Sequence, residues 1–294
     1  MNTDIRIDWQ SGMEITPQTF IDMENNIAEN RMLVRKMISA KNFGVIPRTK
    51  FTVSHELTQS SLHIKQFECS VLLPTGQVIV VESGANINLE IPPKDTKELY
   101  LTVELGSMPT NFSKGGIPYV VNEYKYDLKK LSEIRGEMPL LKIANDNDTW
   151  KVSETYVMPV MAVRSSTPLM EKLEALKKSA VKIIEHDHAA YLTDSVLIMM
   201  LIDQLATFSV DDSSRELVLL CKRIATALSF SIYKHKSELP APNIMDIEPY
   251  LDAFTTFLAD AAVAMNDLKA TVAMPVEEEQ EPEPPVEDVF CPMI

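Results

Sequence analysis

Hydrophobic positions along the chain change their period twice. Between residues 17 and about 39, apolar residues recur at steps of 3, 4, 7 and 3, which is the period of one helical face. Thr16-Pro17 stands before this stretch as an N-cap and a first-turn proline, so a helix should begin there. The apolar residues on the predicted face are Phe20, Met23, Ile27, Val34 and Met37.

From Phe43 to Tyr156 the pattern becomes one of short β-rich runs separated by turn residues. Pro74-Thr75-Gly76 and Asn145-Asp146-Asn147-Asp148 have the composition of hairpin turns between neighbouring runs. No helical segment intervenes, which is typical of an antiparallel sandwich or barrel. The predicted strands cover residues 50–54, 61–73, 77–82, 86–91, 98–105, 119–128, 140–144 and 149–156.

After Pro159 the helical period returns, and polar or proline-rich breaks divide the sequence into four helices. The helices should begin at Ser166-Thr167-Pro168, near Asp194, after Asp211-Asp212-Ser213-Ser214 and after Pro240-Ala241-Pro242. Four helices with short links are typical of an up-down bundle. The expected apolar stripes are Leu169, Leu173, Leu176, Ala180 and Ile184 in the first helix, Leu217, Leu220, Cys221, Ile224, Leu228 and Ile232 in the third, and Tyr250, Phe254, Phe257, Ala261, Met265 and Leu268 in the fourth.

The second of these helices, over residues 194–208, contains the unbroken apolar run 196–202. A helix that is apolar all round must be buried all round, whereas a helix of a lone bundle shows one face to water. Two explanations remain open: packing beneath the sandwich, or contact with another copy of the chain. We favour a homo-oligomer and expect Leu197, Met200 and Leu201 at its contact.

Composition and charge add a third part to the chain. The 294 residues are 45% hydrophobic and 24% charged, which is globular, but their formal net charge is −14. Nucleic acids and anionic membranes are therefore poor partners, and the longest apolar run falls far short of the ~20 residues of a membrane span. The last twenty residues hold seven acids and no Lys or Arg. Together with their prolines, this composition predicts a disordered, extended tail.

The sequence thus predicts an α+β multidomain protein. We expect an antiparallel β-sandwich with an N-terminal helix over residues 1–160, a four-helix bundle over 161–272, and an acidic tail over 273–294. The first ten residues have no apolar core of a signal peptide, and the three cysteines form no C-x-x-C pair, so we expect a cytoplasmic protein.

Signatures of catalysis are missing from the sequence. It has no G-x-S-x-G elbow, no phosphate-binding loop and no G-x-G-x-x-G, and Ser113-Lys114-Gly115-Gly116 is too short to cradle a phosphate. His186 and His188 lie two apart in an expected helix and point about 200° away from each other. His55 and His63 could face each other across a hairpin, without a third ligand in view. We therefore expect no enzyme, no cofactor and no metal site.

Six segments stand out when the chain is followed from its start. The first, Trp9 to Phe20, follows a W-x-x-G-M-x-[IL]-[ST]-P-Q-x-F pattern. The other five segments are Phe43-Gly44-Val45, Leu73-Pro74-Thr75-Gly76, residues 138–144, Tyr156-Val157-Met158-Pro159 and residues 240–261. Taken in this order, the six segments resemble the TssK family of type VI secretion baseplate proteins. The resemblance covers about residues 1–270, although Met158 stands where the family's Y-[VI]-P-P strand end has a proline.

Membership implies a phage-derived architecture whose sandwich is similar to the shoulder domain of phage receptor-binding proteins. It further implies a non-catalytic homotrimer that links the wedge proteins TssF and TssG to the trans-envelope complex at the inner face of the inner membrane. The opening motif should then contact a wedge protein or a neighbouring subunit, or else pin the first helix onto the sandwich. The residues concerned are Trp9, Gly12, Met13, Pro17 and Phe20.

The resemblance has one large departure at the C-terminal side. The family continues after its bundle into a third domain that grips the membrane complex, whereas here only the acidic tail follows, so we expect a short, divergent member. The tail ends on apolar residues, and we expect Val289, Phe290 and Ile294 to dock onto the membrane complex in place of that domain; an inert tail is the alternative. The rival functions are a phage-like tail or receptor-binding protein and a β-sandwich hydrolase.

Overall fold

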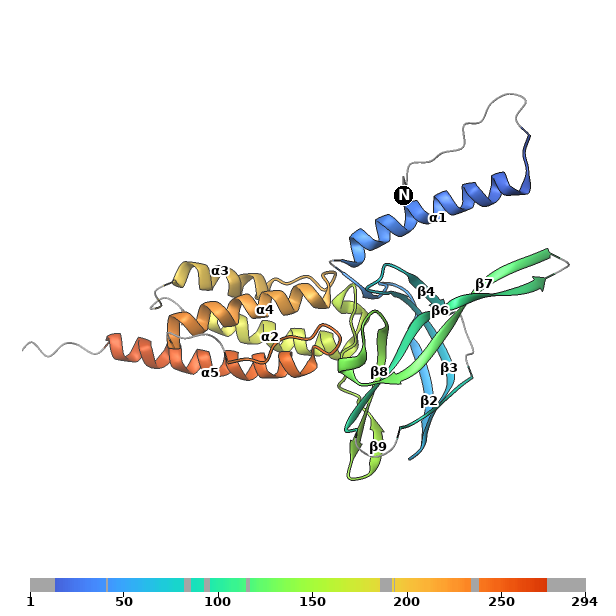
Figure 1. Ribbon diagram of the computed structural model, residues 1–294. Coiled ribbons are helices and arrows are strands. Elements are labelled where there is room, and N and C mark those ends of the chain that lie inside the picture. The colour runs from blue at the N-terminus through green and yellow to red at the C-terminus, as the bar shows by residue number, and fades with distance from the viewer. Residues whose placement is uncertain are drawn as a thin grey trace, which may run out of the picture.

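The computed structural model describes residues 14–40, 42–81, 86–92, 96–114, 117–185, 192, 194–233 and 238–273. The fold is α+β: one long helix, then strands, then four helices that extend to one side of the sheets (Figure 1). The helices are α1 (Pro17–Ser39), α2 (Thr167–Glu185), α3 (Ser195–Ala206), α4 (Ser214–Leu228) and α5 (Glu248–Ala273). The strands are β1 (Gly44–Val45), β2 (Thr52–Leu57), β3 (Ser61–Leu72), β4 (Val78–Val81), β5 (Ile87–Glu90), β6 (Glu98–Lys114), β7 (Ile117–Lys129), β8 (Met138–Asp146) and β9 (Thr149–Val152).

Helix α1 begins at the predicted residue because its N-cap is complete. The Thr16 side chain accepts from the Thr19 backbone N–H, the Thr19 hydroxyl accepts from the Thr16 N–H, and Pro17 occupies the first turn. These contacts satisfy backbone donors that would otherwise lack partners. The predicted helix over residues 17–39 is confirmed.

Two antiparallel sheets follow. In the first, the long strand β3 pairs with β1, β2, β4 and β5; the second has the order β7-β6-β8-β9. Both predicted hairpin turns are confirmed, and Gly76, Asn147 and Asp148 take the positive φ values that such turns require. Buried side chains of both sheets belong to one core, in which the rings of Phe67 on β3 and Tyr126 on β7 meet edge to face at 5.7 Å.

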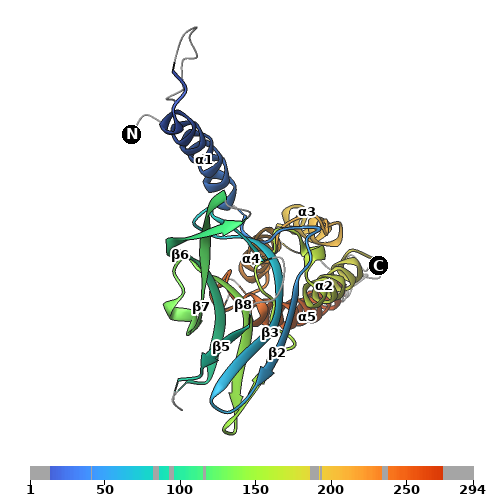
Figure 2. The same cartoon turned by 90° about the vertical axis from the view of Figure 1, so that its right-hand side faces the viewer.

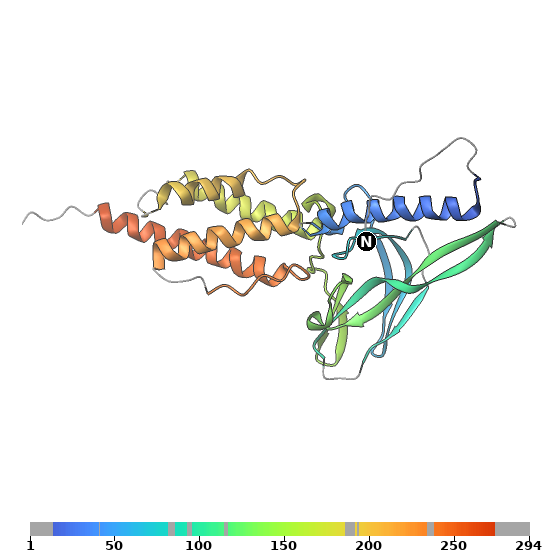
Figure 3. The same ribbon diagram turned by 45° about the horizontal axis from the view of Figure 1, so that its top comes forward.

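The observed strands differ most in length from the predicted ones in the β6–β7 hairpin. Strand β6 continues to Lys114, beyond the predicted end at Leu105, and the paired strands project past the sheets beside α1 (Figures 1 and 3). Gly106 and Pro109 disfavour a strand, so the β pattern is lost there. The structure accommodates them with a register shift between Leu105 and Pro109.

The four later helices pack in a closed order, with α2 against α3, α3 against α4, α4 against α5 and α5 against α2. Two of the predicted stripes need correction. The buried stripe of α2 ends on Ile183 rather than Ile184. Helix α5 buries Leu251 and Leu258 in addition to four of its predicted residues, whereas Phe257 is only half-buried and Leu268 is 39% exposed. A π-helical turn (Ser229–Tyr233) extends α4.

The sheets and helices share one continuous apolar core at their junction. Gly44 approaches Pro159 so closely that a Cβ would lie 2.3 Å from the Pro159 carbonyl oxygen. Val45 N–H donates to that oxygen at 3.0 Å, and Met161 N–H donates to the Val45 carbonyl at 3.1 Å. The buried residues Val160, Val163 and Leu169 continue the core from the sheets into the helices. No helix within the described ranges is long and apolar enough to cross a membrane.

Candidate functional site

Among the described residues, the hydrogen bonds that hold helix α1 to the rest of the chain lie near its C-terminal end. The Ser39 hydroxyl donates to the Pro74 carbonyl at 3.2 Å, Arg215 donates to the Ala40 carbonyl at 2.6 Å, and Gly76 lies directly against Lys36. From this base the helix stands away from the sheets (Figures 1 and 2). The only buried residue on it is Ser39.

The apolar side of α1 therefore faces outward in the single chain. Phe20 is 52% exposed and Met37 is 69% exposed, and Pro17 is exposed as well. We call this set the α1 surface: Ile15, Phe20, Ile21, Ile27, Leu33, Val34, Met37 and Ile38, all exposed. Several large apolar side chains left exposed on one helix mark an interaction site more often than a free protein face.

Helix α3 carries a second exposed apolar surface. Its inner side buries Ile198, Ile202 and Leu205, whereas Leu197 is 53% and Met200 is 57% exposed. The run 196–202 is therefore only partly buried by the described residues of its own chain, and the contact with another copy stays a prediction.

Between α3 and α4 this surface is hollowed. A groove of about 520 Å³, which we call the α3–α4 groove, has an apolar floor and a basic edge on α4. Of the predicted oligomerisation residues, Leu197 and Leu201 line the groove, while Met200 is exposed elsewhere on α3. The residues that matter here are Leu197, Leu201, Leu219, Lys222, Arg223 and Phe230.

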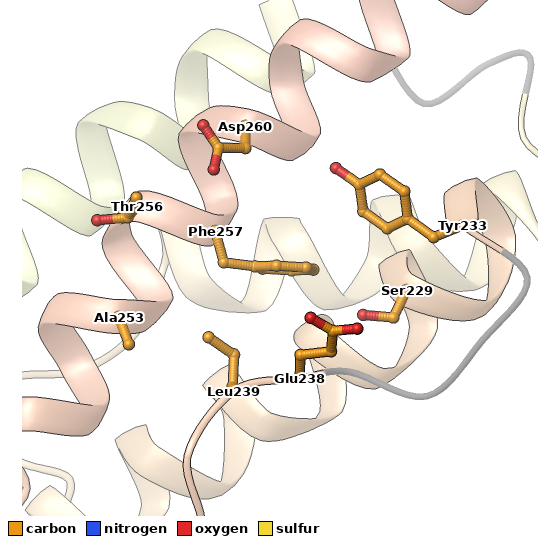
Figure 4. Close-up of a pocket in the computed structure, with 8 residues that line it drawn as sticks. All are labelled: Ser229, Tyr233, Glu238, Leu239, Ala253, Thr256, Phe257 and Asp260. Carbon is orange, nitrogen blue, oxygen red and sulfur yellow. The ribbon is translucent and has the colours of Figure 1, made fainter.

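A further pocket of about 520 Å³ lies between the π-helical turn and α5 (Figure 4). The Phe257 ring lies at its centre, with the carboxylates of Glu238 and Asp260 to either side. An apolar floor with carboxylates on both sides suits a cationic side chain with an apolar stem.

A buried polar network ties the helices to the second sheet. The Asp246 carboxylate, just before α5, accepts from the Tyr100 hydroxyl at 2.6 Å and from Lys142 Nζ at 3.1 Å. Lys142 also pairs with Glu98 at 3.0 Å, and the Tyr156 hydroxyl donates to the Met245 carbonyl at 2.9 Å. Asp246 is 4% exposed, so this charge is stabilised by its partners rather than by water.

Burial and hydrogen bonding together shift the pKa values of Lys142 and Tyr100 in this network. Burial alone would lower the pKa of Lys142, but its hydrogen bonds to Glu98 and Asp246 outweigh that effect and raise the pKa above the ordinary value. Burial and then the bond to Asp246 raise the pKa of Tyr100 far above the ordinary range. These groups hold fixed protonation states at neutral pH, which fits a structural role.

No metal-binding cluster is found in the part of the chain that the structure describes. The proposed meeting of His55 and His63 across a hairpin is wrong, because His63 pairs with Glu56 and His55 with Ile64, which places the two rings on opposite faces of the strand pair. His186 and His188 lie outside the described residues. Cys69 and Cys221 are free, buried thiols.

The structure describes only some of the predicted site residues. Pro17, Phe20, Leu197, Met200 and Leu201 are described, and the structure brings Leu197 and Leu201 together in one groove. The others lie outside the described residues: Trp9, Gly12, Met13, Val289, Phe290 and Ile294.

The likeness to known proteins is one of structure rather than of sequence. No protein-family model matches the chain, and no curated protein matches it. A crystal structure of TssK aligns with a TM-score of 0.61 at 14% identity, over 88% of this chain and 69% of that chain. A chain of the type VI secretion TssK–TssF–TssG baseplate subcomplex aligns with a TM-score of 0.57 at 15% identity, over 88% of this chain and 99% of that chain. TssK from EAEC in complex with a nanobody aligns with a TM-score of 0.54 at 14% identity, over 82% of this chain and 68% of that chain.

The chain has a TssK-like fold.

The TssK-like fold explains three of the sequence segments in physical terms. Gly44 and Pro159 come from two of those segments and contact each other where the sheets meet the helices. Pro74 and Gly76, from a third, form the turn that receives the end of α1. A side chain at Gly44 would clash with Pro159, and Gly76 takes a positive φ in its turn, so both positions favour glycine for a physical reason.

Sequence reasoning missed the α4 side of the groove and the junction network. Leu219 and Phe230 fall outside the buried stripe of α4, and both are exposed. Apolar residues outside the stripe were therefore the sequence signal that could have revealed the groove. Tyr100, Lys142 and Asp246 meet only through the fold and carry no local signal.

Proposed function

We propose that the protein is a non-catalytic structural subunit of a contractile-injection baseplate of the type VI secretion kind. The observation that carries the proposal is the TssK-like fold across 88% of the chain, with two apolar surfaces left open on it. The aligned proteins come from TssK structures and from baseplate complexes, in which a subunit needs several partner surfaces.

Within this proposal the chain has three parts. Residues 1–160 form a β-sandwich with its N-terminal helix, residues 161–272 form a four-helix bundle, and residues 273–294 are a tail. The facing sheets that share one core and the closed packing order of the four helices support the first two parts.

The α3 surface would be the contact of a homotrimer. Leu197, Met200 and Leu201 lie on it. Contact with another copy would take the side chains of Leu197 and Met200, which are more than half exposed, out of water. In a closed ring of three copies each contact is heterologous, so the α3 surface of one subunit would pack against a different surface of the next.

The α1 surface would bind wedge proteins similar to TssF and TssG, or a neighbouring subunit. It projects on the sheet side of the molecule together with the β6–β7 hairpin, away from the far end of the helices (Figure 1). Trp9, Gly12 and Met13 would extend the contact begun by Pro17 and Phe20, because aromatic residues often supply the main binding energy of interfaces.

The apolar end of the tail would dock onto the membrane-anchored complex through Val289, Phe290 and Ile294. A single short peptide binds weakly, but three copies on a trimer gain about 10²–10⁴ in apparent affinity. The protein would then be cytoplasmic and assembled at the inner face of the inner membrane, linking the wedge to the membrane complex.

Co-purification with the wedge proteins of the same secretion system tests this function. The full chain should form a stable complex with TssF- and TssG-like proteins, and Phe20→Asp should weaken the complex without changing the melting temperature. Asn25→Asp, an exposed polar position of the same helix that lies off its apolar side, is the matched control and should retain the complex. Absence of binding by the full chain to any wedge protein of its own system would contradict the proposal.

A further inference from the structure

The α3–α4 groove has a chemical character that limits what can fill it. Its floor is apolar, and Leu219 and Phe230 on it are 41% and 52% exposed. Lys222 and Arg223 stand on its α4 edge, both exposed, and neither is in a salt bridge among the described residues. Asp194, at the start of α3, is the one acidic residue in the described lining. A ligand with an apolar end and acidic residues beside it fits these groups.

The chain itself contains such a segment. Residues 277–288 hold seven acids and no Lys or Arg, and Val289-Phe290-Cys291-Pro292-Met293-Ile294 follows directly. The arrangement of acids beside an apolar end complements a groove with cations beside an apolar floor.

The position of α5 brings this segment within reach. Helices α4 and α5 end on the same side of the molecule, which is where α3 begins (Figures 1 and 3). Asp260 lies level with the π-helical turn that carries Phe230, so the rest of α5 extends roughly 20 Å past the groove. Residues 274–288 span at most about 50 Å when fully extended. That length exceeds the path from the end of α5 to the groove, which is the roughly 20 Å back along α5 plus the width of one helix, roughly 10 Å.

We propose that the acidic tail of each chain folds back and places its apolar end, residues 289–294, in the α3–α4 groove of the same chain. The acids before it lie along Lys222 and Arg223. Attachment to α5 keeps the tail at an effective concentration in the millimolar range, so a weak contact is enough to occupy the groove.

The contact has a consequence that rests on the proposed function. Leu197 and Leu201 line the groove and also belong to the proposed trimer contact, so the folded-back tail and a second copy compete for them. The tail would therefore leave the groove as copies assemble, which frees its apolar end to bind the membrane complex. The intrachain contact itself depends only on the groove and the tail, and it is tested without any baseplate protein.

The test uses chemical crosslinking in the full chain at low concentration. Cys69 and Cys221 are buried, which leaves Cys291 as the reactive native thiol. Thr226→Cys adds a second thiol in the groove. Lys178→Cys adds one at an exposed position of α2, a helix that does not line the groove. A short bismaleimide reagent joins thiols that are close together, and mass spectrometry identifies the linked peptides.

We expect Cys291 to link to position 226 within one chain about tenfold more often than to position 178. Charge reversal at Lys222→Glu and Arg223→Glu should reduce that link several-fold, and so should high salt. Equal linking at positions 226 and 178 would overturn the proposal, and so would links that form only between chains. A link unaffected by both charge reversal and salt would overturn the role given to the two cations.

Failure of this test and failure of the proposed function are separable. Wedge binding with no intrachain link leaves the baseplate role standing and removes the folded-back tail. An intrachain link in a chain that binds no wedge protein does the reverse.

Discussion

Helices α4 and α1 have the same apolar period but opposite environments. In α4 the stripe of Leu217, Leu220, Cys221, Ile224 and Leu228 is buried against its neighbours, whereas on α1 the apolar side stands open. Both sequences show a face that needs a partner. The comparison teaches that periodicity indicates the need for burial but not whether the partner belongs to the same chain.

The largest expected effect separates the two kinds of helix by stability. Phe254→Ala on α5 removes a side chain that is fully buried, and it should lower the free energy of unfolding by about 3–5 kcal/mol. Phe20→Ala on α1 removes one that is 52% exposed and should change it by no more than about 0.5 kcal/mol. Chemical denaturation of both variants at low protein concentration gives the two values. Similar losses would show that α1 is buried in the chain after all.

The buried polar network around Asp246 offers the next test. Its Lys142 is buried on β8, and it can be compared with Lys151, which is exposed on the neighbouring strand β9. Lys142→Met leaves the buried Asp246 carboxylate without its cation and should cost about 3–4 kcal/mol. Lys151→Met removes a partner of Asp146 in a pair that is 66% and 64% exposed, and should cost less than about 1 kcal/mol. Thermal unfolding measures both, and equal effects would contradict a structural role for the network.

Acid should weaken the fold through Glu137, whose side chain is nearly buried. Burial opposes its charge, but the ion pair with Lys129 and the backbone N–H groups of Gly136 and Arg135 outweigh burial and lower its pKa from 4.5 to about 2. Because the folded pKa lies below the unfolded one, the stabilisation is complete above pH 4.5 and is lost as the pH falls towards 2.

The size of this loss should be roughly 2–3 kcal/mol. In Glu137→Gln the same part of the acid dependence should vanish, whereas Glu56→Gln, at an exposed carboxylate paired with Lys65, should leave it intact. Urea unfolding followed between pH 5 and 2 provides the measurement. An unchanged slope in Glu137→Gln would refute the assignment.

The smallest expected effect concerns the α1 surface alone. Met37→Ser exchanges an exposed apolar side chain for a polar one and should shift the stability of the isolated chain by less than about 0.5 kcal/mol. Solubility should rise at the same time, because less apolar surface meets water. Calorimetry and a precipitation assay check the two statements, and a marked loss of stability would show that Met37 packs within the chain.

Much of this fold could be predicted from local patterns. Thr16-Pro17 identified the start of α1 to the residue, since capping chemistry is local, and the turn residues at 74–76 and 145–148 located two hairpins. Strand β6 was predicted too short because Gly106 and Pro109 interrupt the pattern that tertiary pairing restores. In α2 the last buried residue is Ile183 and not Ile184; either one continues the spacing of the stripe, so the sequence alone could not separate them.

The candidate site was harder to predict, because it depends on which faces remain open after folding. The apolar run on α3 pointed to a second contact, and Leu197 and Met200 are exposed in the single chain and thus available for one. The other wall of the groove, with Lys222 and Arg223, comes from a separate helix. Only the packing of α3 on α4 brings the two walls together, so no single stretch of sequence contains the groove.

The central claim is that the open apolar face of α3 is the contact of a homotrimer, and molar mass in solution tests it most directly. Light scattering of the purified full chain at micromolar concentration should give three times the chain mass of 33.1 kDa. Leu197→Asp would bury an unpaired charge at the contact and should lower that mass to one chain. A wild-type chain that is monomeric under these conditions, with its apolar faces open to water, would contradict the account.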